Sequence, residues 1–208
     1  MNIGIIGSGK IGGTLAEKLA AAGHDIGIAN AHGPRSLDEK AERLGDNVHP
    51  MTVEQAARHG DVVIVAIPFG SYRTVAPEPL RGKIVVDAEN YYPQRDGHFP
   101  QLDDGGATSS ELLQDHLRDA RVVKAFNAVR WDTLREPGPA RGDGDRIAMP
   151  LAGDDADAKH IVAVLIDEIG FEPVDVGDLA SGGRKIQPGK PAYTANVDAE
   201  EMRRRLAA

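Results

Sequence analysis

The chain has 208 residues, of which 41% are hydrophobic and 27% charged, as in an ordinary soluble globular protein. Its 32 acidic and 24 basic residues give a formal net charge of −8, which argues against nucleic acid or an anionic membrane surface as the partner. The chain has no cysteine, which excludes disulfides and thiol chemistry, and its longest apolar run, 62–67, is too short to span a bilayer, so we expect a cytoplasmic protein.

Apolar runs alternate with segments of helical periodicity along most of the chain. The pattern predicts buried strands at 3–6, 25–29, 48–51, 61–67, 83–87, 121–126, 146–152 and 171–176. Between them it predicts helices at 11–22, 36–44, 52–59, 109–117 and 155–169. Thr52 with Gln55 has the pattern of a capping box, and Asp154 and Asp155 are interpreted as N-caps of the last of these helices.

Strand–helix alternation of this kind indicates an α/β fold with a Rossmann-type, doubly wound parallel sheet. Loops rich in proline and glycine are predicted over 91–106 and 136–145. Beyond residue 178 the pattern is lost, apart from a short helix at 199–206. We therefore predict a short, irregular C-terminal extension over residues 179–208.

The stretch from Gly4 to Gly13 carries two overlapping glycine patterns. Read from Gly4, it resembles a P-loop, but that loop needs a hydroxyl after its lysine to ligate magnesium, and Ile11 has none. Read from Gly7, it matches the dinucleotide fingerprint, in which three glycines allow the tight turn, the approach of the pyrophosphate and the close packing of the helix: Gly7, Gly9 and Gly12. Residues 1–178 are therefore predicted to form an NAD(P)-binding domain.

The end of the second predicted strand distinguishes NADP from NAD. NAD-binding folds usually place Asp or Glu there, but this chain has no carboxylate before Asp38. It offers neutral and cationic donors suited to a 2′-phosphate instead: Asn30, His32, Arg35 and Ser36. We predict NADP (NADPH), with a helix cap at Ser36 and a solvated Arg35 as the alternative.

With these residues in place, the chain resembles the F420-dependent NADP oxidoreductase family, which also supplies the cytosolic reductase domain of membrane ferric reductases. The resemblance covers nearly the whole chain. It is carried by short motifs in a fixed order, at residues 7–12, 30–36, 65–69, 87–92, 108–111, 123–127 and 152–155.

The resemblance implies hydride transfer between NADP(H) and coenzyme F420 or a related flavin as the small-molecule acceptor. It further implies pyrophosphate contacts from Ser8, Lys10 and Ile11. The ribose and nicotinamide would be bordered by Ile67, Pro68 and Phe69, with Asn90 and Asn127 facing the nicotinamide and the acceptor. The chain departs from the family at Asn127, which stands where the namesake enzymes carry histidine, and in the glycine- and proline-rich stretch 181–196.

Hydride transfer between two cofactors needs proximity and orientation more than an acid or base, so we assign no catalytic side chain. Were the substrate a carbonyl, proton-donor candidates would be Tyr91, Tyr92, His98 and Lys124. Trp131 is interpreted as a core residue, with stacking on an isoalloxazine-like ring as the alternative, and no histidine pattern predicts a metal site.

Two other functions stay open, a non-catalytic NADP(H)-binding sensor or partner subunit and a reductase of small carbonyls or imines. The extension over 179–208 is expected near the acceptor site or a subunit interface. It could cover its own active site or that of a second copy in a homodimer.

Overall fold

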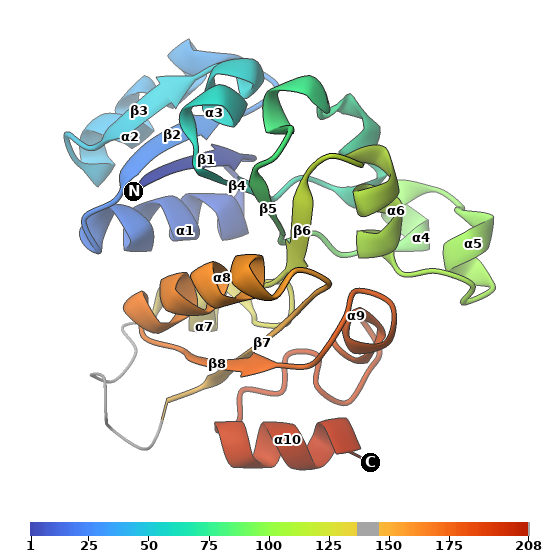
Figure 1. Ribbon diagram of the computed structural model, residues 1–208. Coiled ribbons are helices and arrows are strands. Elements are labelled where there is room, and N and C mark those ends of the chain that lie inside the picture. Colours follow the sequence, from blue (N-terminus) through green and yellow to red (C-terminus); the bar gives the residue numbers. More distant parts are fainter. Residues whose placement is uncertain (137–145, 208) are drawn as a thin grey trace.

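An eight-stranded sheet forms the centre of the computed structural model, which describes residues 1–136 and 146–207 (Figure 1). The strands lie in the order β3-β2-β1-β4-β5-β6-β7-β8. Their bounds are β1 Asn2–Ile6, β2 Asp25–Ala29, β3 Val48–Met51, β4 Val62–Val65, β5 Ile84–Asp87, β6 Arg121–Lys124, β7 Ala148–Gly153 and β8 Glu172–Asp175. Reversal of the strand order at β1 and β4 is the topology of a doubly wound sheet, so the predicted α/β fold of Rossmann type is confirmed. The predicted loop over 136–145 lies, apart from Glu136, outside the described residues.

One strand pair departs from the expected parallel sheet. Neighbouring strands are parallel throughout except β6 and β7, which are antiparallel. A parallel neighbour needs a crossover that carries the chain back along the sheet face. In the described part of the connection between β6 and β7 the only helix is α7 (Trp131–Arg135), which has five residues and is too short for that crossover.

The helices begin largely where the sequence predicts. They are α1 Lys10–Ala21, α2 Asp38–Leu44, α3 Val53–His59, α4 Pro93–Asp96, α5 Pro100–Asp103, α6 Ser109–His116, α8 Ala156–Glu168, α9 Ser181–Lys185 and α10 Ala199–Ala207. The capping box of Thr52 and Gln55 is confirmed, and Asp155 caps α8 by accepting a hydrogen bond from the Ala158 N–H. The predicted loop over 91–106 contains the short helices α4 and α5.

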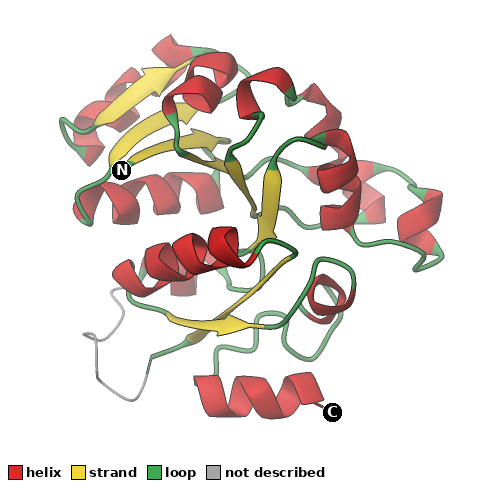
Figure 2. Ribbon diagram, in the orientation of Figure 1, coloured by secondary structure: helices red, strands yellow, loops and turns green. Residues whose placement is uncertain are grey.

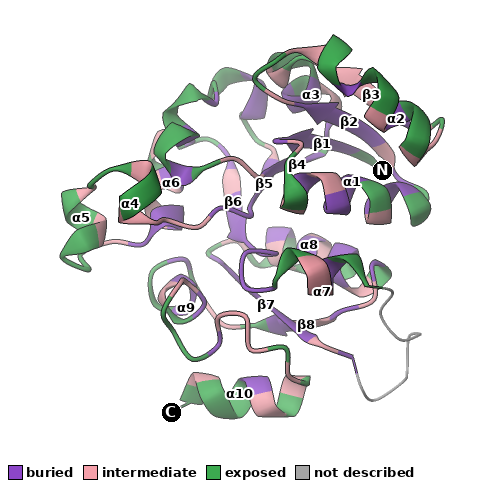
Figure 3. Ribbon diagram, turned by 180° about the vertical axis from the view of Figure 1, so that it is seen from behind, coloured by how far each residue is buried: buried purple, intermediate pink, exposed green. Residues whose placement is uncertain are grey.

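Helices cover both faces of the sheet (Figure 2), and each layer has its own apolar core. Leu15 and Leu19 of α1 and Leu165 of α8 pack on one face in one continuous cluster. On the other face α3 and α6 cover the central strands, whereas α9 and α10 cover β7 and β8 through Ile186 and Met202. Figure 3 shows the buried strands between helices that combine buried and exposed residues. The division of the chain at residue 178 remains a prediction.

None of the helices in the described ranges is long and apolar enough to cross a membrane.

Candidate active site

The glycine turn between β1 and α1 leaves an open space above one residue. Gly7 has a φ of 115°, and a side chain there would collide with the carbonyl oxygen of Ala66. At Gly12 a side chain would collide with the carbonyl of Gly7, so these two glycines are required by the fold itself. A Cβ built on Gly9 meets no atom within 4 Å. The room above Gly9 is therefore available to a ligand.

The same turn exposes the N-terminus of α1. No side chain caps this helix, and its first turn holds no acidic residue. Its free N–H groups and the helix dipole favour an anion at this place. Space above Gly9 and an uncapped helix together fit the pyrophosphate of a dinucleotide, with Ser8, Lys10 and Ile11 beside it in the same turn.

The four residues predicted to hold a 2′-phosphate lie in one turn after β2, next to the glycine loop. The Asn30 amide donates to the hydroxyls of Ser8, at 3.2 Å, and of Ser36, at 3.0 Å. In the described part of the chain the side chains of His32 and Arg35 have no partner, and both residues are exposed. No carboxylate follows β2 until Asp38, so the turn suits a phosphate better than a ribose diol. The 2′-phosphate contact itself stays a prediction.

Two details of this turn differ from the sequence interpretation. The alternative role of Ser36 as a helix cap is wrong, because Ser36 lies inside a 3-10 helix (Pro34–Leu37) that precedes α2, and its hydroxyl donates to the Gly33 carbonyl at 2.7 Å. Lys40 of α2 was not predicted. Its ammonium reaches back to the Ser8 carbonyl at 2.6 Å and places a positive charge behind the glycine turn.

A cavity of about 470 Å³ begins at this turn and follows the carboxyl ends of the central strands. Gly9, Ile67 and Pro68 border one part of it, and Asn90 and Asn127 border another. The structure therefore brings these predicted residues together. Phe69 is an exception, because its ring is fully buried among Tyr72, Tyr91 and Phe99, where apolar packing holds it away from any ligand.

The far wall of the cavity joins β5, β6 and the C-terminal segment. The Asn90 amide donates to the Asn127 carbonyl at 3.0 Å, and the Asn127 amide donates to the Ile186 carbonyl at 2.9 Å. Phe126, which precedes Asn127, has a φ of 62°, a strained conformation for a bulky residue. This turn aims Asn127 at the cavity.

Tyr193 closes the wall from the C-terminal side. Its hydroxyl lies 2.5 Å from the hydroxyl of Tyr92, and both residues border the cavity. Burial and this hydrogen bond raise the pKa of Tyr193 far above its ordinary value, so it is neutral at physiological pH. The predicted extension thus contributes to the cavity of its own chain.

Behind this wall lies a buried cluster of charged side chains. Lys124 Nζ contacts Asp87 Oδ2 at 3.1 Å, and both side chains are out of solvent. Glu89 also borders the cavity and is 2% exposed, but within the described residues neither of its carboxyl oxygens has a hydrogen-bond partner. Burial, reinforced by the negative charge of Asp87, raises the pKa of Glu89 well above its usual range.

Of the four proton-donor candidates only Tyr92 borders this cavity. Lys124 is paired inside the protein, and Tyr91 and His98 bond to Asp103 at the surface. Sequence reasoning missed Glu89. The sequence feature that could have identified Glu89 is its position as an acidic residue two positions beyond a buried strand.

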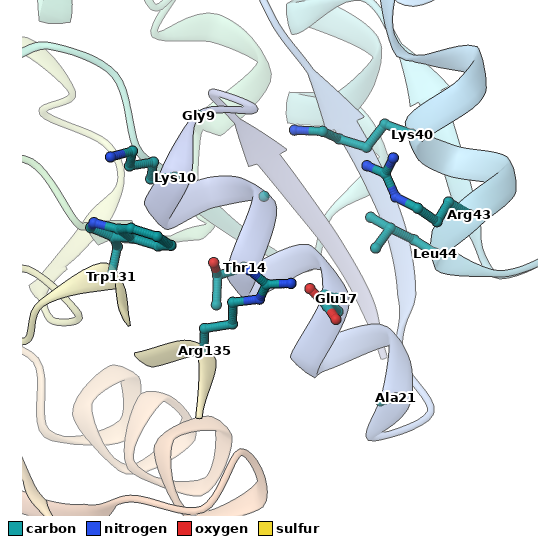
Figure 4. Close-up of a pocket in the computed structure, with 11 residues that line it drawn as sticks. Gly9, Lys10, Thr14, Glu17, Ala21, Lys40, Arg43, Leu44, Trp131 and Arg135 are labelled. Atoms are coloured by element: carbon teal, nitrogen blue, oxygen red, sulfur yellow. The ribbon is translucent and has the colours of Figure 1, made fainter. Parts of the chain in front are cut away.

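A second groove of about 510 Å³ runs along α1 on the other side of Gly9 (Figure 4). Four cationic side chains line it, namely Lys10, Lys40, Arg43 and Arg135, together with Glu17. Trp131 of α7 stands between groove and cavity, with the Lys10 ammonium 4.5 Å from its ring centre. The assignment of Trp131 to the core is wrong, because α7 lies on the surface beside α1 and leaves this residue 37% exposed.

A doubly wound sheet whose first turn leaves room for an anion above Gly9 places this chain among the Rossmann-type dinucleotide-binding proteins. The family model described as NADP oxidoreductase, coenzyme F420-dependent, matches residues 2–91. Over these residues, fewer than half of the chain, the protein is similar to this family of NADP-dependent oxidoreductases.

Solved structures of similar length share the fold. A hypothetical protein of Sinorhizobium meliloti is 38% identical, with a TM-score of 0.81 over 95% of each chain. A candidate F420-dependent NADP reductase of Arthrobacter sp. FB24 is 29% identical, with a TM-score of 0.74 over 87% of this chain and 86% of that one.

Among curated proteins, metalloreductase STEAP3 of Rattus norvegicus is 30% identical over 181 residues, which cover 86% of this chain and 34% of that protein. Erythronate-4-phosphate dehydrogenase of Salinibacter ruber is 30% identical over 178 residues, covering 82% of this chain and 43% of that protein. The chain thus spans less than half the length of these two curated relatives.

Proposed function

We propose that this chain binds NADPH and transfers its hydride to a deazaflavin such as coenzyme F420, or to a related flavin-like acceptor. The observation that carries the proposal is the single cavity that extends from Gly9 to Tyr193. One end of it adjoins the anion position of α1. Its other end is closed by side chains that a dinucleotide fold does not need for the cofactor alone. A second planar molecule beside the nicotinamide accounts for that end.

Bound NADPH supplies the hydride, and the chain supplies its position. The N-terminus of α1 above Gly9 holds the pyrophosphate, and the turn after β2 holds the 2′-phosphate through Arg35. Ile67 and Pro68 form the wall against which the nicotinamide packs, while Asn90 and Asn127 orient it and the acceptor. Fixing two reactants in contact lowers the entropic part of the barrier, which suits a site built for direct transfer.

The charge and shape of the acceptor end favour a planar anionic molecule. Tyr92, Tyr193 and Trp131 offer aromatic surfaces, and the guanidinium groups of Arg95 and Arg130 also border the cavity, each paired with a neighbouring aspartate. Aromatic side chains stack on planar rings, and guanidinium groups pair with phosphate. A flavin-like acceptor that carries a phosphate group has both features.

The test is NADPH oxidation by the purified protein with F420, FMN, FAD or a ferric chelate as acceptor. We expect turnover with F420 or FMN, and faster turnover with NADPH than with NADH. Gly9→Val is the matched variant that should lose turnover with every acceptor. Tight binding of NADPH without turnover on any acceptor would overturn the proposal and would favour a non-catalytic NADP(H) sensor.

A further inference from the structure

Glu89 is an unusual residue for a cavity wall, since a carboxyl group out of water normally has hydrogen-bond or ionic partners. Among the described residues neither of its carboxyl oxygens has one. It is nonetheless 2% exposed and borders the cavity at its acceptor end, together with Asn90 and Tyr193. Packing alone therefore does not explain why a carboxyl group stands at this place in the cavity wall.

The charged groups around Glu89 provide no counter-charge for an ionised Glu89 carboxylate. Four charged groups influence its carboxyl: Asp87 from β5, Lys124 from β6, and Arg95 and Asp96 from α4. Arg95 is bound to Asp96 at 2.8 Å, and Lys124 to Asp87, so each cation is already matched by an acid. A second buried carboxylate beside Asp87 would have no counter-charge.

The two buried acids differ in their hydrogen bonds. Asp87 accepts from the Ser110 hydroxyl at 2.6 Å, from the Glu89 N–H at 2.9 Å and from Lys124. The carboxyl group of Asp87 therefore has its hydrogen-bond partners within the protein. Because the Glu89 carboxyl has no donor within the described residues, the neutral acid is its favoured form.

We propose that Glu89 is a neutral carboxylic acid at the acceptor end of the cavity and donates the proton that accompanies the hydride. The inference rests on the proposed function. Reduction of a flavin-like acceptor by two electrons consumes one hydride from NADPH and one proton. The O–H bond of Glu89 breaks as the proton passes to a ring nitrogen of the acceptor, and Glu89 becomes a carboxylate. A proton from water restores the acid, so the balance is NADPH, acceptor and one proton giving NADP and the reduced acceptor.

The first test needs neither ligand nor turnover. Infrared difference spectra between the wild type and Glu89→Gln, recorded without NADPH at neutral pH, should show the carbonyl stretch of a protonated carboxylic acid that the variant lacks. Glu200→Gln, on the exposed side of α10, is the matched control and should leave this band in place. An ionised Glu89 at neutral pH would overturn the proposal.

The second test separates proton donation from structure. In single-turnover NADPH oxidation Glu89→Gln should lower the rate by about a hundredfold at neutral pH and remove the loss of rate at alkaline pH. NADPH affinity should stay within about twofold, because the residue lies at the acceptor end. Glu89→Asp keeps an acid and should keep a pH-dependent rate, which covers any loss of packing in the amide variant.

A pH–rate profile that is the same in Glu89→Gln and the wild type would overturn this role while leaving the proposed function intact. If the wild type turns over no acceptor at all, both the proposed function and this role fail. In that case the infrared band still reports whether Glu89 holds a proton.

Discussion

Asp87 and Lys124 occupy paired positions on β5 and β6, and their charged atoms lie 3.1 Å apart with both side chains out of solvent. This pair fixes the ends of two neighbouring strands below the cavity. Phe126, with its strained backbone, and Asn127, which borders the cavity, come two and three residues after Lys124 in the chain. The ion pair is therefore part of the support of the site as well as of the sheet.

Loss of the cation alone should be costly. Lys124→Met leaves Asp87 as an uncompensated buried charge, and we expect the free energy of unfolding to fall by about 3–5 kcal/mol in urea denaturation at neutral pH. The double variant Asp87→Asn with Lys124→Met removes both charges and should recover most of that loss. A decrease below about 1 kcal/mol in the single variant would show that the pair is not needed for stability.

Substitutions in the glycine turn distinguish the residue that nucleotide binding requires from the residue that folding requires. Gly9→Val adds a side chain where the protein leaves open space, so its free energy of unfolding should stay within about 1 kcal/mol of the wild type. The same side chain occupies the pyrophosphate position, and fluorescence titration should show more than about a hundredfold weaker binding of both NADPH and NADH, the loss of about 3 kcal/mol. Gly12→Val is the contrasting variant and should fail to fold. Normal NADPH binding by Gly9→Val would contradict the position assigned to the pyrophosphate.

Arg35 tests the choice of NADP over NAD. Arg35→Ala should weaken NADPH binding about tenfold to a hundredfold, the value of one hydrogen bond to a charged group, and leave NADH nearly unchanged. Calorimetric titration with both nucleotides measures the difference. Arg203→Ala, on the exposed side of α10, serves as the control for a general change of charge. Equal losses of affinity for NADPH and NADH would contradict the assignment of the 2′-phosphate to this turn.

The raised pKa of Glu89 makes stability depend on pH in a defined direction. Its ordinary value is 4.5, so above that pH the unfolded chain releases a proton that the folded protein keeps. This contribution to stability is fully present below pH 4.5 and is lost as the pH rises through the higher folded pKa, by up to about 1.4 kcal/mol per pH unit. Glu89→Gln should remove this slope in urea denaturation. Parallel curves for the two proteins over the whole range above pH 4.5 would show that the pKa of Glu89 is not raised in the folded state.

Most of the fold could be predicted because buried parallel strands and amphipathic helices leave strong local patterns, as in 62–67 and 155–169. The glycine turn was equally readable, since each glycine answers a local steric requirement. The direction of β7 was not, because it depends on the path of the chain after β6 rather than on the residues of the strand.

The residues that sequence reasoning misplaced are those whose surroundings come from distant segments. An apolar residue such as Phe69 directly after a strand can either border a ligand or pack in the core. The aromatic rings around Phe69 show that it packs in the core. Trp131 is 37% exposed because α7 lies at the surface, beside α1. Glu89 became notable only when β6 and α4 were seen to leave its carboxyl without a partner.

The hydroxyl contact between Tyr92 and Tyr193 joins residues that are 101 positions apart in the chain. By contrast, the glycine turn and the turn after β2 are close together in the chain, between Gly7 and Ser36. Closing a long loop costs more chain entropy than closing a short one, so we expect the wall at Tyr193 to form later in folding than the glycine turn. Under the proposed function, a newly made chain would acquire its nucleotide site before its acceptor site, which is the order in which the hydride would pass from donor to acceptor.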